Sequence, residues 1–295
     1  MERTRRTRKE LLDFVCNEIE SLGVKIPPSS RWGQIKRLYE AAEGSLIPKD
    51  HPDYQFALEA ERDVQMMAFV FDHIGDLKAD PEFLVQLKKT VQDSPLPQED
   101  RENSDGRNAQ FHLYLAAICK KADMVPRFAE PDLICHSEKT AFAVAAKRIK
   151  NIDRLEERIR SARDQIVKAK LPGVIILDIT LAINRENARP DLPYSDDDFV
   201  RLCQRELNAF IDTKIEKIRQ MLRGTEVRGI ILEASIVVHS ADAKGEPTFI
   251  ALTHGVPTVQ HNRSRQLQFD RFRHNYDLGL YNPQNGAHRV PPRRR

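Results

Sequence analysis

The sequence predicts an α/β protein in which a mixed sheet, flanked by helices, is preceded by an all-helical N-terminal domain. Two observations predict this class. Apolar residues recur at helical spacing through the first hundred residues, whereas residues 107–180 read as helix, short strands, helix and strand. A second long helical pattern then precedes two β-branched runs, which gives a βαβ crossover and therefore a sheet with parallel and antiparallel pairs.

Local signals place the helices of the N-terminal part. The first, 9–22, stops before Gly23, a residue type that commonly follows a helix end. A short helix begins at Asp80 and Pro81, because aspartate is a good cap and proline is tolerated in the first turn. The single tryptophan, Trp32, is interpreted as a packing residue. The other helical stretches are 31–42 and 53–74.

Residues 94–106 are polar, contain prolines and lack periodicity, so they are interpreted as a linker. The sequence therefore indicates a helical N-terminal domain, a linker, an α/β domain and a basic, only partly ordered tail. Their expected bounds are 1–93, 94–106, 107–259 and 260–295.

After the linker, helix and strand periodicity alternate. A helix over 107–121 precedes two or three short strands, one starting near Asp132 and another ending at Lys147. Helical spacing returns over 149–169, where an apolar stripe is expected to cover the sheet. The last elements are a strand at 173–180, a long helix at 195–222 and paired strands at 227–238 and 247–252.

Composition limits the class of protein. The four cysteines lack C-x-x-C spacing and lie in apolar patterns, so they are expected to be reduced core residues of a cytoplasmic protein. No apolar run is long enough to span a bilayer, and the basic N-terminus lacks the apolar core of a signal peptide. Secretion and membrane insertion are therefore not expected.

Positive charge gathers at the two ends of the chain, whose net charge is +3. Residues 260–295 carry eight arginines and two aspartates, residues 1–10 carry five basic and two acidic residues, and the part between is acidic. Basic ends on an acidic body suit a polyanionic partner, although solvated tails are the commoner source of such runs.

One acid and one lysine stand at facing ends of two neighbouring apolar runs. If these runs form a hairpin, Asp132 at the start of one strand lies beside Lys147 at the end of the next. A carboxylate that holds a divalent metal, next to an ammonium group that orients a water, is a workable arrangement for hydrolysing phosphodiesters. On spacing alone, a solvated strand end and a surface lysine are the more common outcome.

The residues around this hairpin form a longer pattern. Pro131-Asp132 is followed after twelve residues by Ala145-Ala146-Lys147-Arg148, then by Ala162-x-x-Gln165 in the next helix and the apolar strand 173–178. This order resembles the PD-(D/E)xK nuclease superfamily, which has a restriction-endonuclease-like fold. The resemblance implies that fold for the α/β domain.

The resemblance also implies roles for individual residues. Asp132, Lys147 and Gln165 take catalytic positions, and Asp132, the Ala146 carbonyl and His112 are the metal ligands, with Mg²⁺ or Mn²⁺ as cofactor. His112 stands where many relatives have an acid, and its nitrogen suits Mn²⁺ better than Mg²⁺. On residue type alone, a histidine on an apolar helix is more often a hydrogen-bonded core residue.

The main departure from the superfamily is Ala145, which stands where a glutamate is usual and cannot bind metal through its side chain. A substitute carboxylate would be needed for catalysis. The nearest candidates by pattern are Glu130, Glu156 and Asp178.

Basic residues outnumber acidic ones nine to four from Ala145 to Lys170. Ordinary solvated charges on a helix explain such a surplus, and so does contact with a phosphate backbone, which needs positive charge more than sequence-specific groups. The candidate nucleic-acid-binding residues are Arg148, Lys150, Arg154 and Arg158.

Three functions remain open at this point. The first is a metal-dependent nuclease acting on nucleic acid, DNA before RNA, in a setting such as bacterial defence or DNA maintenance. The second is an inactive nuclease fold that binds nucleic acid or a protein, supported by Ala145 and His112. The third is an interaction module that meets a protein partner through its helical N-terminal domain.

Overall fold

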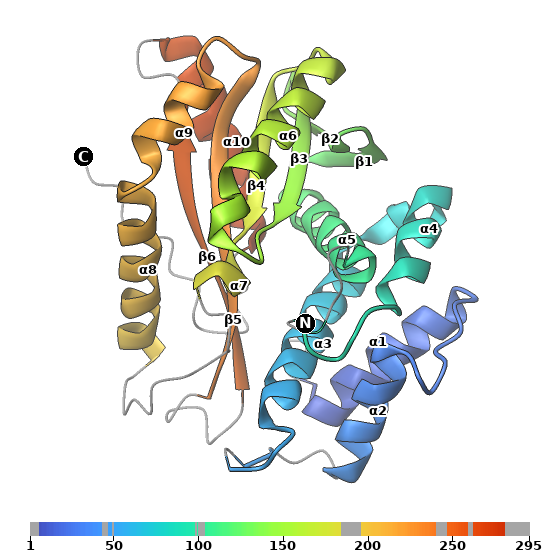
Figure 1. The fold of residues 1–295 in the computed structure, drawn as a ribbon. Helices are drawn as coiled ribbons and strands as arrows, with labels where there is room; N and C mark the ends of the chain where they lie inside the picture. The colour runs from blue at the N-terminus through green and yellow to red at the C-terminus, as the bar shows by residue number, and fades with distance from the viewer. Residues whose placement is uncertain are drawn as a thin grey trace.

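The structure is a computed structural model that describes residues 6–42, 47–48, 50–97, 99, 104–183, 196–239, 247–258 and 262–280. Its centre is a six-stranded sheet in the order β1-β2-β3-β4-β5-β6, with helices packed against both faces (Figure 1). The predicted α/β class with a mixed sheet is therefore confirmed. No helix within these ranges is long and apolar enough to pass through a bilayer.

The N-terminal helices lie where periodicity predicts them. Thr7 and Glu10 form a reciprocal capping box that begins the first helix, and Asp80 accepts a hydrogen bond from the Glu82 N–H at the start of the fourth. Trp32 is fully buried, as expected of a packing residue. The elements are α1 (Arg8–Ser21), α2 (Arg31–Ala41), α3 (Tyr54–His73), the 3-10 helix η1 (Gly75–Ala79), α4 (Pro81–Thr90) and α5 (Asp105–Lys121).

The sheet combines antiparallel and parallel strands. β1, β2 and β3 form an antiparallel meander, β3, β4 and β5 run parallel, and β6 returns antiparallel to β5. Parallel neighbours need crossover connections, and helices supply both of them here. The strands are β1 (Val125–Ala129), β2 (Asp132–Ser137), β3 (Thr140–Arg148), β4 (Gly173–Asp178), β5 (Val227–His239) and β6 (Pro247–Pro257).

The helix predicted over 195–222 exists as two helices. They separate at 213–214, where the Thr213 hydroxyl donates to the Phe210 carbonyl and so satisfies a group at the end of the first helix. The helices after β3 are η2 (Ile152–Arg154), α6 (Leu155–Ala169), α7 (Thr180–Ile183), α8 (Asp196–Asp212), α9 (Ile215–Leu222) and α10 (Arg263–Leu280).

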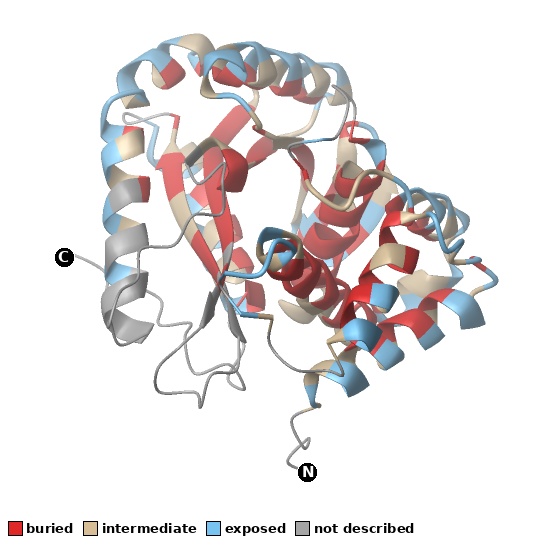
Figure 2. Cartoon of the chain, turned by 60° about the horizontal axis from the view of Figure 1, so that its bottom comes forward, coloured by how far each residue is buried: buried red, intermediate tan, exposed pale blue. Residues whose placement is uncertain are grey.

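Each face of the sheet carries its own apolar layer. Figure 2 shows that buried residues lie on the strands and on the helices around them. On one face, α6, α8 and α9 pack against alternate residues of the strands. The predicted stripe of α6 is part of this layer, since Leu155 and Ile159 are buried in it. On the other face, α1 to α5 and α10 share one continuous cluster with the sheet.

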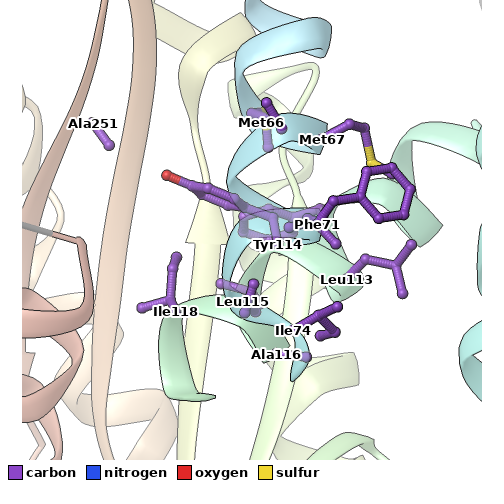
Figure 3. Packing of buried hydrophobic residues seen from close by; sticks show 14 of the residues in the cluster. Met66, Met67, Phe71, Ile74, Leu113, Tyr114, Leu115, Ala116, Ile118 and Ala251 are labelled. Carbon is purple, nitrogen blue, oxygen red and sulfur yellow. The ribbon is translucent and has the colours of Figure 1, made fainter. Parts of the chain in front are cut away.

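This shared cluster changes the domain organisation that the sequence indicates. Val15 of α1 and Trp32 of α2 belong to the same cluster as Val144 and Val174 of the sheet. Figure 3 shows part of that cluster, where α3 and α5 meet. The helices and the sheet therefore have a common core, and the structure does not separate an independent helical domain from it.

The expected linker is also held at both ends. The Arg107 N–H donates to Asp93 at 2.7 Å, and the Arg107 guanidinium donates to the Ser94 and Pro95 carbonyls at 2.9 and 2.8 Å. Residues 98 and 100–103 of this segment lie outside the described ranges.

The expectation of a partly ordered tail after 259 is wrong for α10. Three aromatic residues of this helix, Phe269, Phe272 and Tyr276, are fully buried. A Cβ at Gly229 would lie 2.3 Å from the Phe269 ring, so β5 has a glycine where α10 crosses it. The apolar spacing of α10 is diluted by charged residues, which is why the sequence reads as polar.

We expect Phe272→Ala to lower the free energy of unfolding by about 3 to 5 kcal/mol, because it removes a ring buried between α10 and the sheet. Urea denaturation followed by circular dichroism measures the change. The control is Leu267→Ala on the same helix, where the side chain is 47% exposed and the expected change is within about 0.5 kcal/mol. Equal effects of the two substitutions would contradict the packing of α10.

Candidate functional site

Asp132 and Lys147 meet at the end of the β2–β3 hairpin. Asp132 is the first residue of β2, and its Oδ2 accepts hydrogen bonds from the Ala146 N–H at 2.8 Å and from Lys147 Nζ at 3.3 Å. The antiparallel register brings the start of β2 beside the end of β3, which is what the spacing of the apolar runs predicts. The predicted proximity of the acid and the lysine is confirmed.

His112 brings a third group to the same point from α5. Its Nε2 lies 3.5 Å from Asp132 Oδ1, so the two carboxylate oxygens face different partners. The side chains of His112, Asp132 and Lys147 are 18%, 12% and 15% exposed, which leaves the cluster open to solvent at one side.

Burial controls the charge of the histidine. Desolvation lowers the pKa of His112 below 6.5, and this effect outweighs the Asp132 carboxylate, which favours the imidazolium. His112 is therefore neutral at pH 7 and has a ring nitrogen that can accept a hydrogen bond or bind a metal. The cluster consists of a carboxylate, an ammonium group and a neutral imidazole.

These residues fit a divalent ion in part. Two ligands at neighbouring octahedral positions on a metal with bonds of about 2.1 Å are separated by roughly 3 Å. The 3.5 Å between His112 Nε2 and Asp132 Oδ1 is close to that spacing. However, within the described ranges no group of three or more His, Cys, Asp or Glu side chains gathers to hold a metal.

The proposed substitute carboxylates do not join this pair among the described residues. Glu156 makes ion pairs with Lys217 and Arg160 on the surface. Asp178 accepts a hydrogen bond from Arg148 at 2.9 Å, and Glu130 is exposed in the turn before β2. Glu156 and Asp178 are therefore held by basic side chains, and Glu130 faces solvent.

Ala145 faces the apolar layer beneath α6 and is fully buried there. It stands two residues before Lys147 and on the same face of β3, because strand residues alternate between faces. The structure thus has a buried methyl group at the position where the resemblance implies a second carboxylate.

Gln165 lies towards the other end of the strand pair. Its neighbour Ile166 lies against Gly173, which pairs with Ala143, four residues before Lys147 on β3. Gln165 Oε1 is buried without a hydrogen-bond partner among the described residues. Among the described residues, Ala146 and Lys147 donate hydrogen bonds to Asp132, and Gln165 does not.

The candidate nucleic-acid-binding residues divide into two groups. Arg148 points to the opposite face of β3 from Lys147, is 6% exposed and pairs with Asp178, so the expectation that it contacts a nucleic acid is wrong. Lys150, Arg154 and Arg158 are at or near the surface beside α6. The basic surplus there is reduced by acidic partners, such as Glu157 at 2.9 Å from Arg154.

A buried polar network on the opposite face was not foreseen from the sequence. Arg31, Asp63 and Gln110 are nearly inaccessible and join α2, α3 and α5 through hydrogen bonds and ion pairs. The signal was Glu61-Arg62-Asp63, since three consecutive charged residues occupy too much of a helix circumference to share one solvated face.

Comparisons with known proteins found no match: no family model, no curated protein and no solved structure matches the chain.

The charge state of His112 can be checked by NMR titration of its imidazole nitrogens. We expect a pKa below 6.5 that falls further in Asp132→Asn, because the nearby negative charge is lost. In Lys147→Met the pKa should rise, because a nearby positive charge is lost. Lys168→Met, at an exposed position of α6, is the matched control and should leave the titration unchanged.

The lowered pKa of His112 also affects the stability of the protein. Because this pKa is lower in the folded chain than in the unfolded chain, the unfolded chain binds the proton first. Stability is therefore lost as the pH falls below 6.5. In His112→Gln, the stability lost on acidification should be smaller than in the wild type. A loss of the same size in wild type and variant would show that His112 is not desolvated.

Proposed function

We propose that the chain is a metal-dependent, nuclease-like protein that binds and hydrolyses phosphodiesters of nucleic acid at the cluster of Asp132, Lys147 and His112. The observation that carries this proposal is the convergence of these three side chains from β2, β3 and α5 at one partly exposed point. The resemblance to the PD-(D/E)xK superfamily, and with it the restriction-endonuclease-like fold, belongs to the same proposal.

The arrangement of elements supports it. A buried helix, an antiparallel meander, a crossover helix and a parallel strand follow one another as α5, β1–β3, α6 and β4. This is the order that the resemblance implies. In this order, the acid and the lysine lie on adjacent strands, and the histidine lies on the helix that precedes these strands in the chain.

We propose Mn²⁺ rather than Mg²⁺ as the ion. Mg²⁺ prefers an all-oxygen octahedral shell, whereas imidazole nitrogen is a good ligand for softer divalent metals. Asp132 and His112 would hold the ion, together with the Ala146 carbonyl, and the ion would supply Lewis-acid stabilisation of a phosphoryl oxygen. Lys147, already positioned by Asp132, would add a positive charge beside the phosphate.

A second candidate is a nuclease fold that binds nucleic acid without cutting it. Two observations favour it: Ala145 is buried in the α6 layer, and Asp132 Oδ2 is already engaged by the Ala146 N–H and Lys147. In that case Lys147, Lys150, Arg154 and Arg158 would contact phosphates, and no metal would be required.

Cleavage assays on single- and double-stranded DNA and RNA separate the two candidates. With Mn²⁺ we expect cleavage that falls at least about a hundredfold in Asp132→Ala and in His112→Gln, because each removes a ligand. Mg²⁺ should support little cleavage. The matched control is His136→Gln, at an exposed position on β2, which should cut like the wild type.

Wild-type protein that binds nucleic acid but does not cut with either metal would favour the second candidate. Cleavage that persists in Asp132→Ala would contradict the proposed site, whichever metal is used.

Binding is expected to weaken steeply with salt, because each phosphate contact releases counterions. Arg154→Glu and Arg158→Glu should each lower the affinity and reduce the slope of log affinity against log salt by about one. Fluorescence anisotropy with a labelled oligonucleotide measures both quantities. Lys36→Glu makes the same change of charge on α2 and should leave the slope unchanged; a slope of zero in the wild type would contradict nucleic-acid binding.

A further inference from the structure

The edge strand β1 leaves part of the sheet uncovered. α6 packs over β3 and β4, and the ribbon formed by β1 and β2 extends beyond it (Figure 1). Val125 of β1 is 60% exposed, so the outer part of this ribbon faces solvent. The cluster of Asp132, Lys147 and His112 lies at the start of β2 and is therefore next to the open ribbon.

Arg127 of β1 lies on the same face of the ribbon as Asp132. Ala129 pairs with Asp132 in the antiparallel register, and paired residues point to one face. Arg127 precedes Ala129 by two residues and therefore shares that face. Arg127 is exposed and forms no ion pair within the ranges that the structure describes. Its guanidinium group is thus available to an anion that extends from the cluster.

Lys89 approaches the cluster from α4. It lies in the last turn of this helix, which packs closely on α5: a Cβ at Gly106 would be 2.6 Å from the Lys89 carbonyl oxygen. Burial is the main cause of the lowered pKa of His112, and the positive charges of Lys147 and Lys89 lower this pKa further. The Lys89 charge therefore acts at the cluster. Lys89 is exposed and has no ion-pair partner among the described residues.

These two cations differ from the basic residues of α6. Arg154 pairs with Glu157 at 2.9 Å, and this carboxylate offsets its charge. Lys89 and Arg127 have no such carboxylate among the described residues. A polynucleotide carries a phosphate at every nucleotide, so a phosphate held at the cluster has charged neighbours in the same strand. Binding these neighbours requires cations beside the cluster, and each contact releases counterions.

We propose that Lys89 and Arg127 bind the phosphates that flank the one held at the cluster, so that a nucleic-acid strand runs from the end of α4 past Asp132 onto the β1–β2 ribbon. This proposal rests on the proposed function, because the cluster defines the middle of the path. Arg127 offers paired donors that suit two phosphate oxygens, whereas Lys89 acts as a point charge.

The test is fluorescence anisotropy of the full chain with a labelled DNA oligonucleotide, in EDTA so that the DNA is not cut. Arg127→Gln and Lys89→Gln should each weaken binding by about five- to tenfold in 0.1 M salt, because each removes one phosphate contact. The slope of log affinity against log salt should fall by about one. Arg127→Lys keeps the charge and should retain most of the affinity. Arg37→Gln, at an exposed position of α2, is the matched control and should bind like the wild type.

A change of opposite sign is expected at the turn between β1 and β2. Glu130 is exposed there, and Glu130→Gln removes a negative charge beside the proposed path. Its affinity for the oligonucleotide should rise by about twofold. Unlabelled poly-glutamate should compete poorly with the DNA. Equal competition at the same concentration of charge would overturn the proposal, since the surface would then bind any polyanion.

The outcomes separate this proposal from the proposed function. If the wild type binds with a steep salt dependence, and Arg127→Gln and Lys89→Gln bind equally well, the path is wrong while the proposed function stands. If only one of the two substitutions has no effect, the path past that residue is wrong. Wild-type protein that binds no oligonucleotide at low salt contradicts the proposed function, and the path fails with it.

Discussion

The burial of α5 is the constraint on which the rest of the structure depends. Most residues of this helix are inaccessible, and it contacts α3, α4 and α10 as well as the first three strands. A helix that is apolar on nearly all sides can be stable in water only when other elements surround it. The N-terminal helices and α10 provide that cover, so segments from both ends of the chain pack on a helix in its middle. His112 reaches Asp132 because α5 is fixed in this way.

Charged residues take part in the same packing. α3 carries Glu59, Arg62 and Asp63 into the interior, where they pair with one another or with Arg31 and Arg107. Taking such groups out of water costs several kcal/mol per ion, and a buried pair offsets this only with good geometry and additional hydrogen bonds. These pairs therefore add little to net stability. They define how α2, α3 and α5 fit together, because a different arrangement would leave one of the charges unpaired.

At the ends of β3 and β4, the two faces of the sheet carry different polar side chains. On one face, Asp132 and Lys147 form a partly exposed cluster, which His112 joins from α5. On the covered side, Arg148 and Asp178 face a cavity with room for a single water-sized species. Successive residues of β3 supply both sites, because Lys147 and Arg148 point to opposite faces of the strand.

The sequence by itself determined the elements and their neighbours. Helical periodicity and caps located α1 to α4, and the apolar runs located β2, β3 and the meeting of Asp132 with Lys147, since a hairpin register follows from local spacing.

Tertiary structure alone decided the rest. It made α10 a core helix although charged residues dilute its apolar spacing, and it buried Arg148 instead of leaving it beside Lys150. It also left Gln165 Oε1 buried without a hydrogen-bond partner among the described residues. The physical reason is that burial and charge pairing depend on residues distant in the chain, whereas capping, periodicity and hairpin register depend on residues close in sequence.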